Sequence, residues 1–566
     1  MTAPPPRTPP IAVVGVGALF PGSSDISGFW RDILGGVDRI TDVPATHWLP
    51  EDYYDPDPAA PDRTYARRGA FLSPVPFDPL EFGVPPAIVP ATDTAQLLAL
   101  LVARAALRDH AGGPLPPEAR ARTSVILGVT SGQELLGTMV SRLQRPVWVK
   151  ALRELGWPED QIQAACERIA GHYVPWVEST FPGLLGNVVA GRIANRFDLG
   201  GTNLVTDAAC ASTFAALHAA IHELAAGDAD LVLTGGVDTS NDIFMFTCFS
   251  KTPALSPTGD CRPFSAAADG TMLGEGLGML VLKRLADAER DGDRIHAVIR
   301  GVGTSSDGRA KSIYAPVSEG QARALRRAYA AADIDPATVE LVEAHGTGTV
   351  AGDLAEFRGL QLVFRPEDAG RTRWCALGSI KSQIGHTKAA AGAAGLLKAI
   401  LALRHRVLPP TIKVDRPDPR LGLDSSAFYL NTAARPWIAS AAHPRRAGVS
   451  SFGFGGTNFH VVVEEYAGPA PKALRENARP GELVLLSEGT AEALAAACRD
   501  TAAAATSASR QGAAAVRDAA ANALAWLARA SQRRFDRAAP ARLAVVARDP
   551  DELAALLRAA ADALAT

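Results

Sequence analysis

The amino-acid sequence predicts an α/β protein made of one large domain and a small C-terminal unit of different character. Two observations lead to this prediction. From about residue 11 to residue 465, short apolar runs of strand length alternate with stretches of helical pattern, which is typical of layered α/β folds. After a Pro-containing linker at 466–482, residues 483–566 become very rich in alanine. We therefore expect both parts to be α/β, with the larger part holding the main core.

The predicted elements follow in a regular order. Residues 1–10 are rich in proline and are expected to be disordered, and residues 11–22 read as a buried strand followed by a Gly-rich turn. Further strands are predicted at 123–129, 229–238, 277–285 and 458–466. Helices are predicted at 92–111, directly after Cys210, at 389–405, and as insertions within 134–180. In residues 483–566 we expect long amphipathic helices and one strand, at 542–547.

Composition excludes several classes of function. The chain has 566 residues with 57 basic and 60 acidic side chains, and this balance gives no support to a nucleic-acid or membrane-surface role. Its six cysteines form no C-x-x-C pair, so neither a zinc site nor a redox motif is expected. The first residues lack the apolar stretch of a signal peptide, and no apolar run has the length of a membrane span. A cytoplasmic protein with free thiols is the expectation.

The first strand and its turn also raise the possibility of a dinucleotide site. Gly15 and Gly17 match the first two glycines of that fingerprint, but Phe20 stands where the third belongs. A strand followed by a tight turn is therefore the preferred interpretation.

The segment TDAACASTF at 206–214 places Cys210 among small residues, between an apolar run and a helical pattern. A cysteine at a strand-to-helix turn lies near the helix N-terminus, where unpaired N–H groups favour the thiolate. The small neighbours would let a substrate approach closely. Because free cysteine is among the most buried residue types, a structural thiol is the competing interpretation. This segment alone leaves both interpretations open.

Three further segments carry residues suited to catalysis. His345 lies in the loop EAHGTGTVAGD (343–353), and Lys381 and His386 lie in GSIKSQIGHTKAAAGAAG (378–395). Taken singly, His345 could instead tie down its loop, and Lys381 could be a surface lysine. The Gly-rich turn in GVSSFGFGGTNFH (448–460) has backbone N–H groups that could serve an oxyanion. One cysteine and two histidines together predict a site for carbon–carbon bond formation, because a thiolate can hold an acyl group and imidazoles can stabilise an enolate.

In this order, the Cys, HGTGT, K-x-x-x-x-H and GFGGTN segments resemble the β-ketoacyl synthase (ketosynthase) family of fatty-acid and polyketide synthases, over about residues 11–465. DTAQLLAL (93–100) stands where assembly-line ketosynthases usually carry a DPQQR-like motif. KSQIGHTKAAAG, SKTPALSP and SIYAP resemble the iterative polyunsaturated-fatty-acid synthases, with enediyne and glycolipid synthases as close relatives. Residues 483–566 resemble the linker between a ketosynthase and an acyltransferase. No GHSxG motif is found, so we expect that the chain either stops before that domain or never had one.

The resemblance implies a thiolase-like fold of two similar α/β halves in five layers, dimerised through the N-terminal half. It assigns Cys210 as the nucleophile, His345 and His386 as the decarboxylation pair, and Lys381 as a supporting cation. The N–H groups of Cys210 and Phe454 would form the oxyanion hole, with Phe454 also gating malonyl entry. The assignment is completed by two residues expected to contact the pantetheine arm, Thr347 and Thr349.

The resemblance also implies partners. An acyl carrier protein would supply acyl and malonyl groups on its phosphopantetheine arm, and an acyltransferase domain would act in cis or in trans. No cofactor or metal is expected on this chain, and no nucleic acid or membrane partner. No heptad pattern precedes the first strand, so a coiled-coil docking helix is not expected.

Two rival functions stay open at this point. A CoA-dependent thiolase would use a second catalytic cysteine, and the segment GFGGTN contains none. A non-condensing scaffold or chain-length partner would normally have lost the nucleophile, whereas Cys210, His345 and His386 are all present.

Overall fold

The computed structural model describes residues 8–130, 134–309, 312–468, 481–512 and 517–565, and side chains within 508–522 are not considered. The chain divides into two compact units, 1–473 and 474–566, and each is described by itself below. Most of the expected disordered segment 1–10 and of the linker 466–482 lies outside the described residues. The domain limits inferred from the sequence therefore stay predictions.

An 11-stranded sheet runs through the large unit, in the order β13-β11-β10-β15-β16-β9-β1-β8-β6-β4-β5. It consists of two halves with the same topology. In each half the third, second, fourth, fifth and first strands are neighbours, and the fifth runs antiparallel to the strands beside it. The strands of the first half are β1 (Ile11–Leu19), β4 (Thr123–Val129), β5 (Asn203–Thr206), β6 (Leu231–Asp238) and β8 (Gly276–Arg284). Those of the second half are β9 (Ala297–Ser306), β10 (Leu341–Glu343), β11 (Cys375–Gly378), β15 (Arg446–Gly453) and β16 (Thr457–Glu464), with β13 (Phe428–Leu430) added beyond β11.

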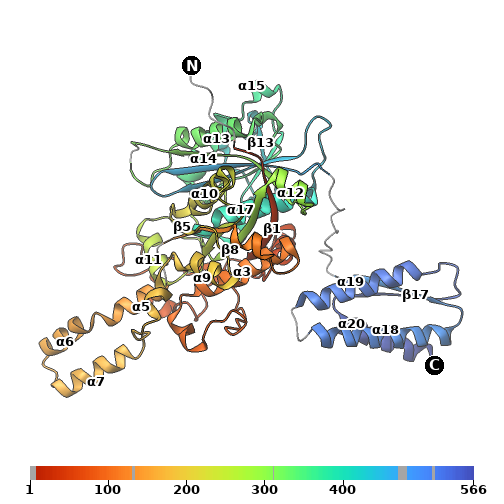
Figure 1. The fold of residues 1–566 in the computed structure, drawn as a ribbon, viewed down its shortest axis with the longest axis horizontal. Helices are drawn as coiled ribbons and strands as arrows, with labels where there is room; N and C mark the ends of the chain where they lie inside the picture. Colours follow the sequence, from red (N-terminus) through yellow and green to blue (C-terminus); the bar gives the residue numbers. More distant parts are fainter. Residues whose placement is uncertain (1–7, 131–133, 310–311, 469–480, 513–516, 566) are drawn as a thin grey trace. The chain divides into compact units, whose positions relative to one another are not determined.

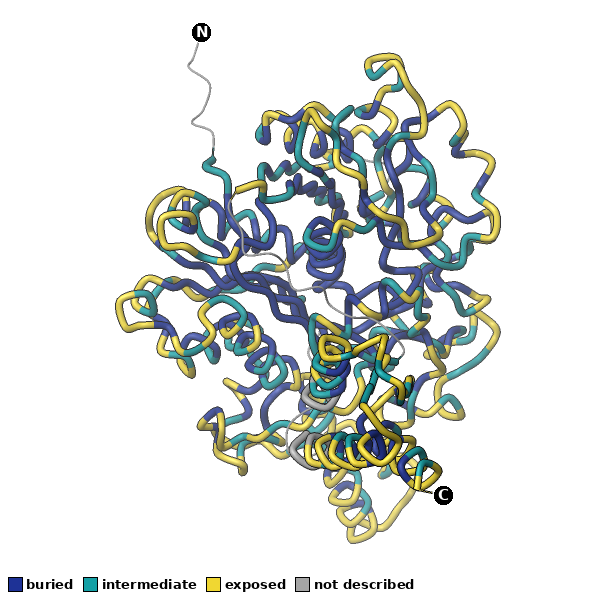
Figure 2. The backbone as a smooth tube through the Cα atoms, turned by 90° about the vertical axis from the view of Figure 1, so that its right-hand side faces the viewer, coloured by how far each residue is buried: buried dark blue, intermediate teal, exposed yellow. Residues whose placement is uncertain are grey.

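The large unit has five layers (Figure 1). The two halves of the sheet form two of them, and helices form one layer between the halves and one on the outer face of each half. Two helices, α10 (Ser212–Ala226) and α17 (Ala391–His405), form the central layer, and more than half of the residues of each are buried. Figure 2 shows buried backbone, in dark blue, through the interior of the large unit. The outer helices are α3 (Thr94–Ala111) and α9 (Val188–Phe197) on the first half, and α13 (Ser318–Ala332) and α14 (Val350–Gln361) on the second. This arrangement confirms the thiolase-like fold that the sequence resemblance implied.

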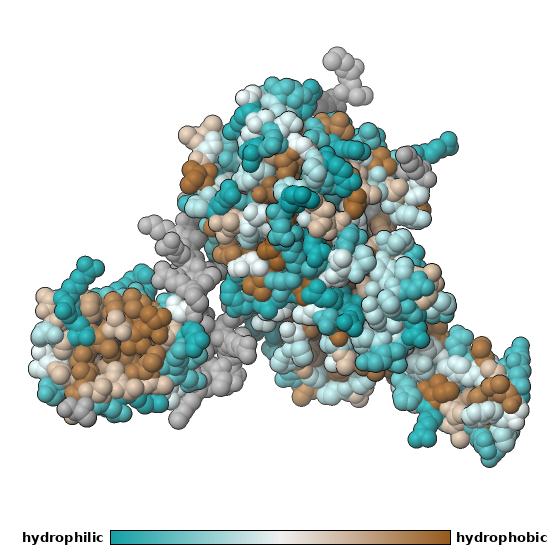
Figure 3. Space-filling view, turned by 180° about the vertical axis from the view of Figure 1, so that it is seen from behind, coloured by the Kyte–Doolittle hydropathy of each residue, from teal (hydrophilic) through white to brown (hydrophobic). Residues whose placement is uncertain are grey.

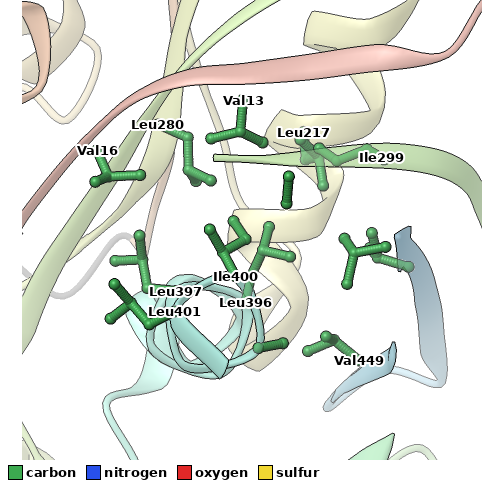
Figure 4. Close-up of a cluster of buried hydrophobic side chains, with 14 of the residues drawn as sticks. Val13, Val16, Leu217, Leu280, Ile299, Leu396, Leu397, Ile400, Leu401 and Val449 are labelled. Atoms are coloured by element: carbon green, nitrogen blue, oxygen red, sulfur yellow. The ribbon is translucent and has the colours of Figure 1, made fainter. Parts of the chain in front are cut away.

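Alternation along β1 shows how the sequence dictates these layers. Val13 contributes to the central core and Val14 to the outer core formed with α3. A register shift between Val13 and Gly15 then changes the alternation, so Val16 returns to the central core beside Leu397, as Figure 4 shows. Successive side chains of a strand point to opposite faces, so a strand covered by helices on both sides must be apolar throughout. All nine residues of β1 are accordingly buried.

The two central helices begin in the same unusual way. Each follows a short 3-10 turn, Ala209–Ala211 before α10 and Lys388–Ala390 before α17. The first residue of each turn has left-handed backbone, with φ of 49° at Ala209 and 46° at Lys388. For a residue with a Cβ atom this conformation costs about 1–2 kcal/mol, so surrounding contacts must hold both turns in place. The shared geometry makes Cys210 and Ala389 equivalent positions of the two halves.

The strands predicted at 123–129, 229–238, 277–285 and 458–466 are confirmed as β4, β6, β8 and β16, and the predicted helices as α3, α10 and α17. The insertion within 134–180 is helical, as expected, and consists of α5 (Glu134–Arg142), α6 (Arg145–Glu154), α7 (Glu159–Ala170) and α8 (Thr180–Leu184). Helices α6 and α7 project from the large unit (Figure 1). Exposed apolar side chains on and beside them include Val147, Leu155 and Trp157. Figure 3 shows brown patches on this projection, at the lower right.

The described residues of the C-terminal unit contain two strands, whereas one was predicted from the sequence. β17 (Glu482–Glu488) pairs antiparallel with β18 (Ala541–Ala547), and three helices complete the described part of the unit: α18 (Ala491–Gly512), α19 (Arg517–Arg534) and α20 (Pro550–Leu564). β17 was not predicted from the sequence, whereas β18 corresponds to the strand expected at 542–547. Helix α19 also contacts β17, because the Leu485 N–H of this strand donates a hydrogen bond to Ser531 Oγ at 3.0 Å.

Across the residues given above, no helix combines the length and apolar character needed to cross a membrane.

Candidate active site

A cavity of about 370 Å³ lies where the two halves of the large unit meet. The first half contributes Cys210, and the second contributes His345, His386 and Phe454. The remaining lining is mostly apolar, with aromatic rings from Phe249, Tyr314 and Phe452 among it. The structure thus brings together three residues that lie far apart in the sequence and were each singled out as candidates.

Cys210 occupies the middle of the 3-10 turn that precedes α10 and is 6% exposed. Strand β15 holds this turn from the other half, because Ser451 Oγ donates a 2.7 Å hydrogen bond to the Cys210 carbonyl oxygen. Two residues later the backbone comes even closer: a Cβ atom placed on Gly453 would lie 2.2 Å from the Ala208 carbonyl oxygen. The Phe454 N–H then faces Cys210 Sγ as a hydrogen-bond donor.

Burial raises the pKa of the Cys210 thiol to about 11, against lowering contributions from the Lys381 charge and the Phe454 N–H group. This corrects the expectation that the helix N-terminus favours the thiolate at this position. A thiol removed from water loses the hydration that stabilises its anion, and here that loss outweighs the nearby dipoles and cations. In the resting site Cys210 is therefore protonated at neutral pH.

His386 has a defined tautomer in this structure. Its Nδ1 atom accepts a 3.0 Å hydrogen bond from the backbone N–H of Lys388. The residue is 2% exposed, and burial together with the Lys381 charge lowers its pKa well below the ordinary value, so the imidazole is neutral. A neutral ring that accepts at Nδ1 carries its proton on Nε2. His386 can therefore donate a hydrogen bond from Nε2.

His345 meets His386 edge to face, with ring centroids 5.3 Å apart and an interplanar angle of 83°. Its loop is fixed by Glu356, whose two carboxylate oxygens accept from the N–H groups of His345 and Gly346 at 2.8 and 2.7 Å. Burial and the Lys381 charge lower the pKa of His345 well below its usual range. Both histidines are thus neutral, and each ring carries one N–H group that can donate a hydrogen bond.

Lys381 is 3% exposed and is not one of the described residues that line the cavity. Burial lowers its pKa, while the carboxylates of Glu343 and Glu356 act in the opposite direction. Its charge lowers the pKa values of Cys210, His345 and His386. The position agrees with a cation that tunes its surroundings, and it excludes the alternative of a surface lysine.

The sequence analysis missed two buried carboxyl groups on α14. Glu356 supports the His345 loop as described, and Asp353 accepts from Gly348 N–H at 3.1 Å and Phe264 N–H at 2.7 Å. Burial raises the pKa of each to about 7. These two residues follow His345 by eight and eleven positions and are three residues apart. In a helix this spacing places both carboxyl groups on one face, and it could have identified them from the sequence.

Thr347 and Thr349 both line the cavity, and their hydroxyl groups are 2.9 Å apart. Thr349 also caps α14 by accepting from Gly352 N–H at 3.3 Å. Phe454 is 47% exposed, and its ring stacks on Phe249 with centroids 6.2 Å apart. Within the described part of the chain, no cluster of three or more His, Cys, Asp or Glu side chains could hold a metal ion.

Comparison with known families agrees with this geometry. The model of the β-ketoacyl synthase N-terminal domain matches residues 8–288, and that of the β-ketoacyl synthase C-terminal domain matches residues 296–415. A ketoacyl-synthetase C-terminal extension matches residues 417–528.

Two curated relatives are similar over most of this chain. A polyunsaturated fatty acid synthase protein from Thraustochytrium sp. is 44% identical over 494 residues, which is 86% of this chain and 18% of that protein. A phenolphthiocerol/phthiocerol polyketide synthase protein from Mycobacterium tuberculosis is 40% identical over 458 residues, which is 81% of this chain and 23% of that protein. The chain thus spans 18–23% of the length of these relatives.

Solved structures show the same fold. The oxazolomycin ketosynthase domain OzmH KS7 from Streptomyces albus has a TM-score of 0.72 and 32% identity, covering 98% of this chain and 88% of that one. A ketosynthase from module 6 of the bacillaene synthase of Bacillus subtilis has a TM-score of 0.68 and 29% identity, covering 98% and 85%. The motifs, the duplicated five-layer fold and these matches together show that the chain belongs to the β-ketoacyl synthase family.

Proposed function

We propose that this chain catalyses decarboxylative condensation between an acyl group held on Cys210 and a malonyl group carried by an acyl carrier protein. The observation that carries the proposal is the meeting of Cys210, His345 and His386 in one largely apolar cavity. Family membership and the lack of a cysteine in the GFGGTN turn favour this reaction over that of a CoA-dependent thiolase.

In the first step Cys210 takes over the acyl chain. Its thiol loses a proton as Sγ attacks the carbonyl carbon of the acyl-carrier thioester, and the pantetheine thiol leaves with a proton. Negative charge develops on the carbonyl oxygen, and the N–H groups of Cys210 and Phe454 would stabilise it as an oxyanion hole. Cys210 is 6% exposed, so the new thioester forms where little water reaches it.

In the second step the malonyl group loses CO₂. The bond between the carboxylate and the neighbouring carbon breaks, and its electron pair moves toward the thioester oxygen to give an enolate. His386 would donate from Nε2–H to that oxygen, and His345 would donate beside it. Both rings are neutral, so each has one N–H group to donate to the developing anion. Thr347 and Thr349 would contact the pantetheine arm along the cavity wall.

In the third step the enolate carbon attacks the carbonyl carbon of the acyl-cysteine. A carbon–carbon bond forms, the bond to Sγ breaks, and Cys210 regains a proton. The product is a β-ketoacyl chain on the carrier protein. Phe454 would gate malonyl entry, which its exposed ring at the cavity and its stacking on Phe249 support.

The product class and the setting are inferred from the relatives. Similarity to the polyunsaturated fatty acid synthase protein favours an iterative synthase that makes fatty-acid or polyketide chains. Such a chain would work with carrier and acyltransferase domains in cis or in trans, in the cytoplasm. Homodimer formation through the N-terminal half is part of the proposal, and β5 supports it because it ends the sheet with an unpaired edge among the described strands.

Two substitutions at Cys210 test this function. Cys210→Ala should abolish transfer of a radiolabelled acyl group from its carrier, while Cys210→Gln should still release CO₂ from malonyl carrier without condensing it. Light scattering on the same preparations would check for the dimer. A folded Gln variant that neither condenses nor decarboxylates would show that the division between the cysteine and the histidines is wrong.

A further inference from the structure

A buried lysine stands directly behind the histidine that donates from Nε2. Lys388 is 3% exposed, and its ammonium group has three acceptors: Asp238 Oδ1 at 2.9 Å, Asn241 Oδ1 at 2.8 Å and the Gly274 carbonyl oxygen at 2.9 Å. Three acceptors match the three donors of an ammonium group, so the side chain has little freedom to move. Asp238 ends β6 in the first half, whereas Lys388 belongs to the second half.

The backbone of Lys388 is held in a conformation that it would not adopt unaided. Its φ of 46° lies in the left-handed region, which disfavours residues with a Cβ atom. That conformation points the Lys388 N–H at His386 Nδ1. Asp238 secures the turn a second time, because its Oδ2 accepts from the Ala389 N–H at 3.2 Å. Asp238 thus holds the turn at two neighbouring residues, through the side chain of Lys388 and through the backbone N–H of Ala389.

We infer that Lys388 is a positioning residue for the decarboxylation step: its ion pair with Asp238 holds the turn whose N–H selects the Nε2–H tautomer of His386 and aims that proton into the cavity. Without the anchor, the turn would relax toward negative φ and the N–H would leave Nδ1. His386 would then divide its proton between both nitrogens, and only part of the population could donate to an enolate oxygen. This inference rests on the proposed function, because it concerns the direction in which the Nε2–H group of His386, a proposed hydrogen-bond donor, points.

A double substitution separates positioning from simple loss of structure. Lys388→Met alone leaves the Asp238 carboxylate buried without its cation, which is strongly destabilising in itself. Lys388→Met with Asp238→Asn removes both charges, keeps the side-chain length at 238 and shortens the side chain at 388 by one atom. It also keeps the electrostatics at Cys210 balanced, because Lys388 lowers and Asp238 raises the pKa of that thiol. The matched control is Lys283→Met with Asp293→Asn, which removes a 2.7 Å ion pair at the end of β8.

The assay compares the two half-reactions. In a Cys210→Gln background, the Lys388/Asp238 double variant should release CO₂ from malonyl carrier at least about tenfold more slowly, approaching the 10²–10³ typical of removing such a donor outright. With Cys210 present, it should still accept an acyl group at a rate within about twofold of the parent. The control pair should leave both rates unchanged.

Histidine NMR supplies a readout that a merely structural role would not move. The ¹³Cδ2 resonance of His386, assigned by its loss in His386→Gln, should report the Nε2–H tautomer in the parent and a mixture in the double variant. A folded double variant with parental CO₂ release and an unchanged tautomer would overturn the inference and leave the proposed function intact. Loss of CO₂ release in the Cys210→Gln parent itself would instead refute the proposed function.

Discussion

The Ser451 hydroxyl donates a 2.7 Å hydrogen bond to the Cys210 carbonyl oxygen, and this bond joins a strand of one half to the nucleophile turn of the other. Ser451 is 1% exposed, so no water can replace it readily. The bond fixes the orientation of the turn, which matters because the N–H of Cys210 is a proposed oxyanion donor.

Replacing Ser451 by alanine should therefore weaken both stability and catalysis. The orphaned carbonyl costs about 1–3 kcal/mol in the free energy of unfolding, measured by urea titration. Acyl transfer to Cys210 should slow as the turn loosens, while Ser451→Thr, which keeps the hydroxyl, should recover most of the rate. Parental acyl transfer in a Ser451→Ala variant would contradict this role.

Gly453→Ala should disturb the same turn by contact. The added Cβ would meet the Ala208 carbonyl oxygen at 2.2 Å, so the turn or β15 must shift, at about 1–3 kcal/mol. We expect a lower unfolding midpoint and slower acylation. Gly137→Ala in α5 is the control, because its Cβ would meet nothing within 4 Å and alanine favours a helix by about 1 kcal/mol. Equal stability of the two variants would count against the close approach.

Reactivity of Cys210 should increase with pH well beyond neutrality. Because burial raises its pKa to about 11, the thiolate fraction should grow about tenfold per pH unit between pH 7 and 10. Alkylation by iodoacetamide, mapped by mass spectrometry in a Cys248→Ser background because Cys248 is exposed, should follow this slope. Lys381→Met should slow it further, since the lysine charge lowers that pKa. A rate that levels off near pH 7 would show a stabilised thiolate instead.

His345→Ala and His386→Ala should separate the half-reactions. Each removes one proposed donor to the malonyl thioester oxygen, which typically costs about 10²–10³ in rate. Both variants should still be acylated at Cys210, as seen by intact-protein mass spectrometry, yet release CO₂ from malonyl carrier far more slowly. Condensation at near the parental rate by either variant would remove that histidine from the mechanism.

Local patterns predicted five of the eleven strands of the large sheet, β1, β4, β6, β8 and β16, and the central residues of the candidate site. Cys210, His345 and His386 could be found because each lies in a distinctive run of small residues, and the strands could be found from their continuous apolar character. The duplication of the two halves could not be found in this way. Val13 and Ile299 take part in the same core from β1 and β9, but nothing in their immediate surroundings shows that the halves share a topology.

Properties that depend on contacts between residues far apart in the chain could not be predicted from the sequence. The pKa of Cys210 was expected to fall because the helix terminus is a local feature, whereas the burial that raises it comes from both halves. Nothing in the local sequence marked Lys388 as a functional residue. The inferred role of Lys388 depends on Asp238 and Asn241, which are far from it in the sequence. β17 likewise forms only by pairing with β18.

The cavity is lined by Cys210 from one half and by His345, His386 and Phe454 from the other, and the Ser451 and Lys388 contacts both cross the same boundary. Neither half alone carries the whole of the proposed site. The rate of the proposed reaction should therefore report whether the two halves are still in contact. Partial unfolding that separates them should abolish this reaction before much secondary structure is lost, even if the strands within each half stay paired. Under mild denaturant, activity should disappear ahead of the far-ultraviolet circular dichroism signal.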